Sequence, residues 1–328
     1  MGSRNGFARA LAGGVLVLDG GLSNALEAQG YDLGDALWSA RLLRDAPGAI
    51  VRAHAGYFAA GARVATTASY QASFEGFAAA GVGRAEAAGL MRRSVALARE
   101  AAEGRADRFV AASVGPYGAY LADGSEYRGR YGLTRRQLLD FHRPRVEALA
   151  EAGPDALALE TVPDVEEAEA LVEATAGLGL PVWLSYSAEG GRTRAGQPLA
   201  EAFRAVAGAP HVVALGVNCL RPEEADAAVE TAARAGGGTP VVVYPNSGER
   251  WDAGRRRWAG GPTFRPERVA AWTAAGARLV GGCCRVGPEQ IRALAVAVAR
   301  EAGGVSGVPG ASGAPGASGA SQDRPGRG

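Results

Sequence analysis

The chain alternates eight short apolar or β-branched runs with longer helix-forming stretches, and this alternation restricts the fold most strongly. The runs cover residues 15–21, 62–70, 109–117, 156–161, 182–187, 212–219, 240–247 and 278–284. Each is too short for a helix and is followed by an Ala-, Glu- and Arg-rich stretch, as at 90–103, 165–175, 223–235 and 289–301. Alternating strands and helices predict a parallel sheet, and eight such units predict a (β/α)8 TIM barrel. An open doubly wound sheet is the alternative, but its Gly-x-Gly-x-x-Gly fingerprint is absent from the sequence.

We expect one domain of this type at residues 1–302. A length of 328 residues is normal for a single barrel, and 47% apolar with 21% charged residues allows a sizeable core. Residues 303–328 consist almost entirely of Gly, Ala, Ser and Pro. Such a segment buries too little apolar surface to offset its chain entropy, so we predict a disordered tail.

The composition excludes several functions. A formal net charge of +1 gives no long-range attraction to nucleic acid or to an anionic membrane. All 35 basic residues are arginines, so the chain has no Schiff-base lysine for aldolase or pyridoxal-phosphate chemistry. It also lacks the phosphate-binding lysine of P-loop proteins and kinases. We therefore expect the arginines at 255–257 to lie in a solvated loop rather than in a nucleic-acid patch.

No segment has the pattern of a targeting or membrane-spanning element. Residues 1–14 contain no apolar core of a secretory signal, and no stretch of about 18 uncharged apolar residues occurs. Three cysteines in this length do not form a disulfide framework. The sequence thus predicts a cytoplasmic protein with reduced thiols.

Polar and reactive residues gather at the C-terminal ends of six of the expected strands. They are Asp19, Thr67, Ser69, Glu160, Asn218, Cys219, Asn246, Ser247, Cys283 and Cys284. In a barrel these strand ends converge on one mouth, where the loops after the strands build the active site. We therefore expect these side chains to share one site.

All three cysteines of the chain belong to this set, at the ends of the sixth and eighth strands. Three thiolates with one open position form the ligand pattern of a catalytic zinc site, which predicts Zn²⁺ bound by Cys219, Cys283 and Cys284. Two other interpretations remain open. The cysteines can be small buried apolar residues, or Cys283 and Cys284 can form a redox pair, although adjacent cysteines close only a strained disulfide ring.

Several segments match one enzyme family in order along the chain. They include LDGGLSNAL from residue 18, SVGPYGAYLADGSEYRGRY from 113, ETVPDVEEAEA from 160, GVNCLRP from 216, YPNSGERWD from 244 and GGCCRVGPEQI from 281. Together the segments cover most of residues 15–295, and GVNC with GGCC in this order is highly specific. The chain resembles the zinc-dependent homocysteine S-methyltransferase family. YPNSGE and GGCCR are more similar to its branch that uses S-methylmethionine or S-adenosylmethionine than to its betaine branch.

The resemblance implies transfer of a methyl group from a sulfonium donor to L-homocysteine, forming methionine. A free thiol has a pKa near ~8.5 and is mostly protonated at neutral pH, whereas zinc binding favours the nucleophilic thiolate. Three protein thiolates also leave the zinc site with excess negative charge, which attracts a sulfonium cation. The expected partners are therefore small-molecule substrates.

The resemblance also implies substrate-binding roles. If Leu157 and Leu159 face the helices, the strand period of two turns Glu160 into the barrel mouth, where it pairs with the α-ammonium of homocysteine. The turn at Asp19 and Gly20 offers backbone N–H groups to the substrate carboxylate, and Ser69 offers a hydroxyl to the same group. The alternatives are a capping carboxylate, a turn that requires glycine, and a strand-end hydroxyl.

Asn218 and Asn246 are candidates for orienting the loops that carry the cysteines, although turn roles are an equal alternative. The competing functions are a betaine- or selenocysteine-type methyltransferase of the same fold, a fragment of a cobalamin-dependent methionine synthase, and a non-catalytic zinc or thiol redox sensor. The predicted amino-acid pocket argues against a sensor. The sequence leaves open the preferred donor, the donor-binding residues, the role of the tail and the oligomeric state.

Overall fold

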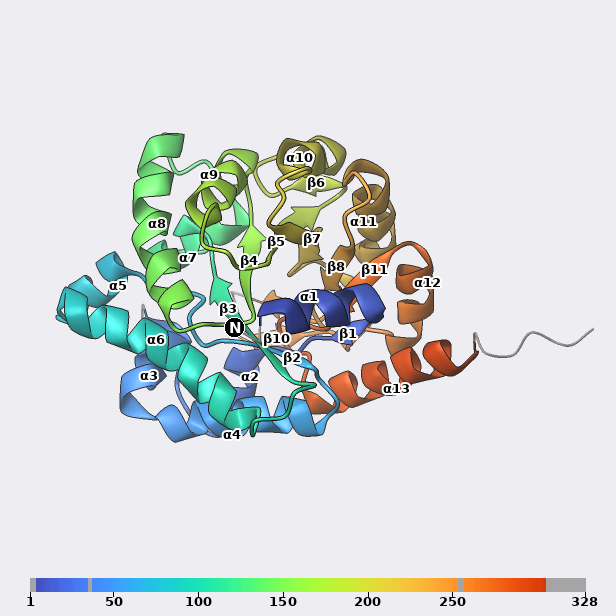
Figure 1. The fold of residues 1–328 in the computed structure, drawn as a ribbon, viewed down its shortest axis with the longest axis horizontal. Helices are drawn as coiled ribbons and strands as arrows, with labels where there is room; N and C mark the ends of the chain where they lie inside the picture. The colour runs from blue at the N-terminus through green and yellow to red at the C-terminus, as the bar shows by residue number, and fades with distance from the viewer. Residues whose placement is uncertain (1–3, 35–36, 253–256, 305–328) are drawn as a thin grey trace, which may run out of the picture.

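The computed structural model describes residues 4–34, 37–252 and 257–304 (Figure 1). Eight parallel strands form its main sheet, in the order β1-β11-β8-β7-β5-β4-β3-β2. Their bounds are β1 (Leu16–Val17), β2 (Val64–Thr66), β3 (Phe109–Val114), β4 (Ala156–Val162), β5 (Val182–Glu189), β7 (Val212–Asn218), β8 (Val241–Tyr244) and β11 (Ala277–Val280). Each of the eight predicted runs overlaps one of these strands, and β4, β5 and β11 extend one or two residues beyond their runs.

The first and last strands of that order meet and nearly close the barrel. Leu18 forms a parallel bridge with Val64. On either side, Arg63 N donates to the Val17 carbonyl at 2.7 Å and Asp19 N donates to the Val64 carbonyl at 3.0 Å. The (β/α)8 barrel prediction is therefore confirmed, and the doubly wound alternative is wrong.

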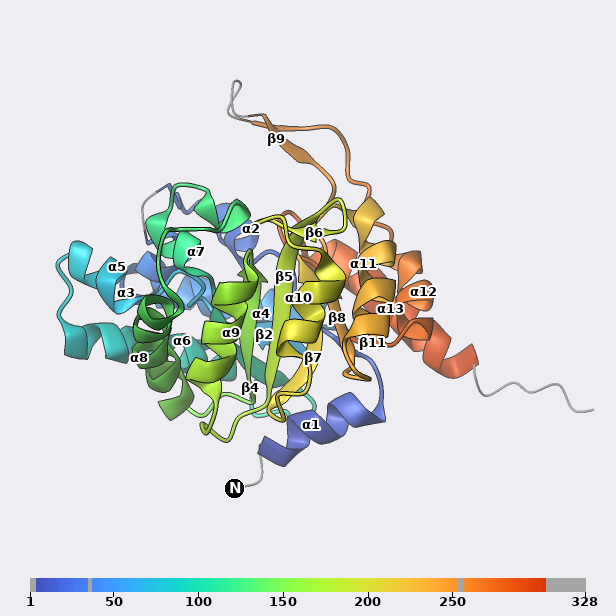
Figure 2. The ribbon, with the colours of Figure 1, turned by 90° about the horizontal axis from the view of Figure 1, so that it is seen from above.

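Helices surround the strands (Figures 1 and 2). The main ones are α4 (Pro47–Ala59), α6 (Arg84–Ala101), α8 (Arg135–Glu151), α9 (Val165–Thr175), α10 (Leu199–Val206), α11 (Pro222–Ala235), α12 (Val269–Ala274) and α13 (Pro288–Gly304). The four stretches predicted as helical fall in α6, α9, α11 and α13. Proline begins α11 and α13, at a position where its missing N–H costs no helical hydrogen bond.

Shorter elements lie in the connections. They are α2 (Leu22–Glu27), η1 (Trp38–Arg41), α3 (Leu42–Asp45), α5 (Phe74–Ala79), α7 (Tyr117–Leu121), η2 (Ser125–Tyr127), β6 (Arg192–Thr193), β9 (Arg250–Asp252), β10 (Arg257–Ala259) and η3 (Pro266–Arg268). The connection from β3 to α8 is the one that contributes η2 to the site described below.

An additional helix, α1 (Arg4–Gly13), precedes the first strand and was not predicted. It closes the N-terminal end of the barrel (Figure 2). Phe7 is fully buried there, stacked on Trp183 with ring centroids 6.2 Å apart and edge-on to Phe109 at 5.6 Å. Leu11, one helical turn later, joins the same cluster. The interior of the barrel is therefore a packed core at this end.

The side chains of β4 alternate as predicted. Ala156 and Ala158 belong to the interior cluster, whereas Leu157 and Leu159 pack in the outer layer against the helices. This register turns Glu160, the next residue of the inner face, towards the C-terminal mouth.

Two predicted segments extend outside the described residues. Helix α13 includes 303 and 304, while 305–328 lie outside the description, so the disordered tail stays a prediction. Arg255 and Arg256 also lie outside it, and Arg257 begins β10, which pairs with β9 in a two-stranded sheet separate from the barrel sheet. Within the described ranges, no helix has the length and apolarity needed to cross a bilayer.

Candidate active site

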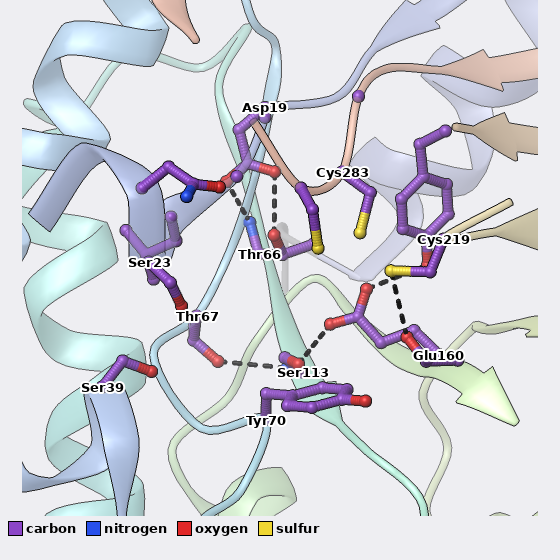
Figure 3. A pocket seen from close by; sticks show the side chains of 18 of the residues that line it. Asp19, Ser23, Ser39, Thr66, Thr67, Tyr70, Ser113, Glu160, Cys219 and Cys283 are labelled. Carbon is purple, nitrogen blue, oxygen red and sulfur yellow. Dashed lines mark hydrogen bonds between the residues drawn. The ribbon is translucent and has the colours of Figure 1, made fainter. Parts of the chain in front are cut away.

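A cavity of about 360 Å³ opens at the C-terminal ends of the strands. Its polar lining includes Asp19, Thr66, Thr67, Ser113, Glu126, Tyr127, Glu160, Cys219, Tyr244, Cys283 and Cys284. The side chains of Asp19, Glu160 and Cys219 point into the same space although they come from three different strand ends (Figure 3). The predicted convergence on one mouth therefore holds for Asp19, Thr67, Glu160 and the three cysteines. Four other residues of the predicted set do not line the cavity: Ser69, Asn218, Asn246 and Ser247.

The three cysteines form one cluster. Their sulfur atoms all lie within 4.8 Å of one another. Cys219 follows β7 with a left-handed φ of +50°, a conformation that non-glycine residues rarely adopt and that is frequent at functional sites. Hydrogen bonds from the Cys219 and Cys283 thiols lower the pKa of Cys284 well below its usual value. The neighbouring thiols thus stabilise one thiolate, at Cys284, and hydrogen bonds with Cys219 and Cys284 raise the pKa of Cys283.

Both predicted asparagines contact the residues that position this cluster. Asn218 accepts a hydrogen bond from Thr161 N at 2.8 Å and donates to Thr161 Oγ1 at 2.7 Å, and that hydroxyl donates to Cys219 Sγ at 3.9 Å. Asn246 Oδ1 accepts from the backbone N–H of Cys284 at 3.1 Å. Asn246 therefore holds the backbone of Cys284 directly. Asn218 holds Thr161, whose hydroxyl group contacts Cys219.

Glu160 is held in a buried hydrogen-bond network. Ser113 donates to one carboxylate oxygen, and Tyr244 OH donates to the other at 3.0 Å. Trp183 Nε1 donates to the Tyr244 oxygen at 3.2 Å, and Ser185 Oγ lies 2.7 Å from the same atom. Burial raises the pKa of Glu160 above its usual value. The fixed carboxylate can offer a cationic group a preorganised partner.

Asp19 is also buried, and two hydrogen bonds from Thr66 hold its carboxylate. Thr66 N and Thr66 Oγ1 each donate at 2.8 Å. Burial raises the pKa of Asp19 to about 8. A Cβ added at Gly20 would lie 2.1 Å from the Val286 carbonyl oxygen, and Gly21 N donates to that oxygen at 3.0 Å. The turn therefore needs glycine to pack against the loop after β11, and the Gly21 N–H is engaged within the protein.

Ser69 does not line the cavity. It is fully buried, donates to the Ser113 carbonyl at 2.8 Å, and lies 2.6 Å from Thr67 Oγ1. Thr67 and Tyr70, its neighbours in sequence, line the cavity instead.

The residues of η2 were missed. Glu126 and Tyr127 line the cavity, and a hydrogen bond from Tyr127 contributes to lowering the pKa of Cys284. They lie in a long loop rather than at a strand end. The only signal for them was their place in the segment SVGPYGAYLADGSEYRGRY.

The homocysteine S-methyltransferase family profile matches residues 16–298, which is most of the chain and includes all three cysteines. The chain belongs to the homocysteine S-methyltransferase family. The predicted family and its methyltransferase class are therefore confirmed. The profile begins after α1, so this helix lies outside the matched region.

Relatives in this family match most of the length of the chain. The homocysteine S-methyltransferase of Escherichia coli is 46% identical over 298 residues, covering 85% of this chain and 94% of the relative. Homocysteine S-methyltransferase 4 of Zea mays is 45% identical over 323 residues, covering 92% and 94%. The crystal structure of the E. coli homocysteine methyltransferase MmuM in its metallated form matches with a TM-score of 0.78 and 44% identity, over 86% of this chain and 96% of that one.

Proposed function

We propose that this chain transfers a methyl group from a sulfonium amino acid, S-methylmethionine or S-adenosylmethionine, to the sulfur of L-homocysteine, forming methionine, and that it binds Zn²⁺ to do so. The observation that carries the proposal is the three-cysteine cluster beside a buried, hydrogen-bonded glutamate in one cavity. The cysteine cluster suits a metal that binds a thiol substrate, and the glutamate suits the ammonium group of an amino acid.

The cysteines suit zinc as a cofactor. Cys219, Cys283 and Cys284 offer three sulfur ligands, one fewer than a closed structural site uses, so one position is left for a substrate. Among the described residues this is the one group of His, Cys, Asp or Glu side chains found close enough to share an ion. When bound, zinc favours the thiolate form of a thiol placed at its open position. The metallated state named for E. coli MmuM supports a metal here.

Glu160 receives the α-ammonium of homocysteine in this proposal. Ser113 and Tyr244 fix both oxygens of its carboxylate, so the group is oriented before the substrate binds. Its raised pKa reflects burial without a cation, and an ammonium partner would favour the charged form.

The other end of homocysteine, its carboxylate, meets no basic side chain among the described lining residues. We propose that it contacts the backbone of the Asp19 and Gly20 turn and the hydroxyl groups that follow β2. Thr67 lines the cavity, and Ser69 supports it from behind through the 2.6 Å contact between their oxygens. Asn218 and Asn246 keep the cysteine loops in place.

The remaining task of the chain is alignment. The substrate sulfur becomes a nucleophile when its thiol proton is released to solvent. The thiolate then forms a bond to the methyl carbon while the donor's sulfur–methyl bond breaks and the donor leaves as a neutral thioether, so the transfer itself needs no general base. Holding the two substrates in line is worth up to roughly 7–11 kcal/mol of barrier reduction. The acidic and thiolate lining also attracts a sulfonium cation.

The test is methionine formation by zinc-loaded protein from L-homocysteine, with S-methylmethionine, S-adenosylmethionine and betaine compared in parallel. We expect methionine from at least one sulfonium donor. Product from betaine alone would move the chain to the betaine-using reaction. No product from any donor, with zinc bound stoichiometrically, would overturn the proposal, and thiol-dependent zinc release would then favour the sensor.

A further inference from the structure

The cavity is lined by four carboxylates and, within the described part of the chain, by no basic side chain. The four are Asp19, Glu27, Glu126 and Glu160. A homocysteine molecule brings one ammonium group, whereas a sulfonium amino acid brings an ammonium group of its own as well as the sulfonium. The lining therefore has more carboxyl groups than the single ammonium group of homocysteine would use.

Three of the four carboxylates already have hydrogen-bond donors. Asp19 accepts twice from Thr66, and Glu160 accepts from two hydroxyl groups. Glu27 accepts from Asn24 Nδ2 at 2.9 Å and is exposed to solvent. None of these three presents a buried oxygen without a partner.

Glu126 differs from the others. Its side chain lines the cavity and only 9% of the residue is exposed, yet Oε2 is buried without any hydrogen-bond partner. A buried carboxylate oxygen that finds no donor is destabilising, because burial removes the water that would otherwise solvate it. Burial accordingly raises the pKa of Glu126. Such a group is suited to an N–H donor that arrives with a ligand.

The backbone that carries Glu126 is closely packed. A Cβ added at Gly118 of α7 would lie 2.3 Å from Glu126 N, so only glycine permits this approach of α7 to η2. Ser187 Oγ donates to the Glu126 carbonyl oxygen at 3.4 Å. The backbone of Glu126 is thus fixed at the cavity wall, which places its side chain among the lining residues.

We propose that Glu126 recognises the α-ammonium group of the methyl donor, and so selects donors that are sulfonium amino acids. This inference rests on the methyl transfer proposed above. An ammonium group can donate the hydrogen bond that Glu126 Oε2 lacks, whereas a sulfonium or a quaternary ammonium has no N–H to donate. Glu160 already serves the ammonium of homocysteine, so the two glutamates divide the two substrates between them.

The proposal predicts a selective defect in Glu126→Gln. The amide keeps the size of the side chain but loses the charge, and a hydrogen bond to a charged partner is worth about 10- to 100-fold in affinity. In zinc-loaded protein we expect the KM for S-methylmethionine or S-adenosylmethionine to rise by about that factor, and the KM for homocysteine to change by less than about twofold. Glu160→Gln is the matched variant, with the opposite pattern expected.

A binding measurement separates recognition from damage to the loop. Calorimetry compares S-methylmethionine with dimethylsulfoniopropionate, a sulfonium that has no α-ammonium. Glu126→Gln should weaken the first and leave the second unchanged. Should the variant not fold, as judged by its melting temperature, the wild-type protein still decides: it should bind dimethylsulfoniopropionate at least about 10-fold more weakly than S-methylmethionine.

The outcomes against the proposal are distinct from those against the methyl transfer. Equal affinity of the wild type for both sulfonium compounds, an unchanged donor KM in Glu126→Gln, or a rise in the homocysteine KM instead would each overturn the role of Glu126 while turnover by the wild type stands. Absence of methionine from every donor in the wild type would overturn the proposed function itself.

Discussion

The two ends of the barrel are built from the same strands and differ in what the inward-facing residues carry. On β4, Ala156 and Ala158 face the closed end, and Glu160, two residues on, faces the cavity. The change takes place along one face of one strand, because alternate residues of a strand share a side. A shift of one residue in the pairing would replace that carboxylate with Leu159 or Thr161.

A chain of side chains joins the two ends. Phe7 of α1 stacks on Trp183, whose indole N–H donates to Tyr244 OH, and that hydroxyl donates to Glu160. The apolar end thus supports the groups that orient the proposed substrate-binding carboxylate. Stability and chemistry are therefore separated along the barrel axis but share a packed interior.

Cys219→Ser should separate the two ends most completely, because it removes function from the open end and leaves the packing of the closed end intact. We expect zinc retention and turnover to be lost. Substituting a residue that only supports a metal ligand typically lowers metal affinity or activity by about 10–100-fold, and loss of a ligand itself should lower them further. Metal content after dialysis and methionine formation are the measurements. The metal-free variant should melt at the temperature of the metal-free wild type. Normal turnover would contradict the zinc mechanism.

Phe7→Ala should do the reverse. It removes a fully buried ring between Trp183 and Phe109. Such a deletion typically costs about 3–5 kcal/mol of unfolding free energy. Denaturant unfolding measures that loss. Turnover by folded protein should fall far less than in Cys219→Ser, because Phe7 reaches Glu160 only through Trp183 and Tyr244. Arg9→Ala, on the exposed face of the same helix, is the control and should change stability by less than about 0.5 kcal/mol. A cost no larger than that of the control would show that α1 does not close the barrel.

The features that depend on the periodicity of a strand or helix could be predicted from the sequence. The eight strands and the inward face of β4 depend on local alternation, and the cysteines lie where two strands end. Phe7 and Leu11 are one helical turn apart, so a signal for α1 was also present.

The residues that the sequence did not place lie where periodicity stops. After β2 ends at Thr66, Ser69 N bonds back to the Thr67 carbonyl at 2.8 Å, and this turn takes the Ser69 side chain away from the cavity. Glu126 lies in a connection shaped by the left-handed Gly124 and by contact with Gly118. Neither contact follows from spacing, because each depends on the three-dimensional packing of the loop.

His54, in the helix layer, is a buried polar residue of a different kind from those at the open end. It is fully buried in α4, and neither ring nitrogen has a hydrogen-bond partner among the described residues, unlike the partnered Glu160 and Asp19. Burial lowers the pKa of His54 from 6.5 to about 4. The unfolded chain therefore binds the proton more readily, and stability is lost as the pH falls from 6.5 towards about 4. The full loss amounts to about 3 kcal/mol.

His54→Leu should remove this part of the acid sensitivity. The measurement is the unfolding free energy of metal-free protein between pH 4 and pH 7, taken as the difference between wild type and variant. Burial lowers the pKa of His142 in the same direction, but His142 is present in both proteins and its contribution subtracts out. Parallel pH profiles for the two proteins would show that His54 is not the source.

Asn246 tests the open end with the smallest expected effect. Its side-chain oxygen accepts the Cys284 N–H at 3.1 Å, whereas Asn218 reaches Cys219 through Thr161. Asn246→Ala leaves that N–H without its acceptor and should weaken zinc binding by about 10-fold, the low end for residues that support a ligand. Asn246→Asp keeps the acceptor and should restore most of the affinity. Competition with a chelator measures both, and the melting temperature of metal-free protein checks that the fold is unaffected. Equal zinc affinity in the alanine variant and the wild type would mean that the Asn246 side chain does not position the loop that carries Cys284.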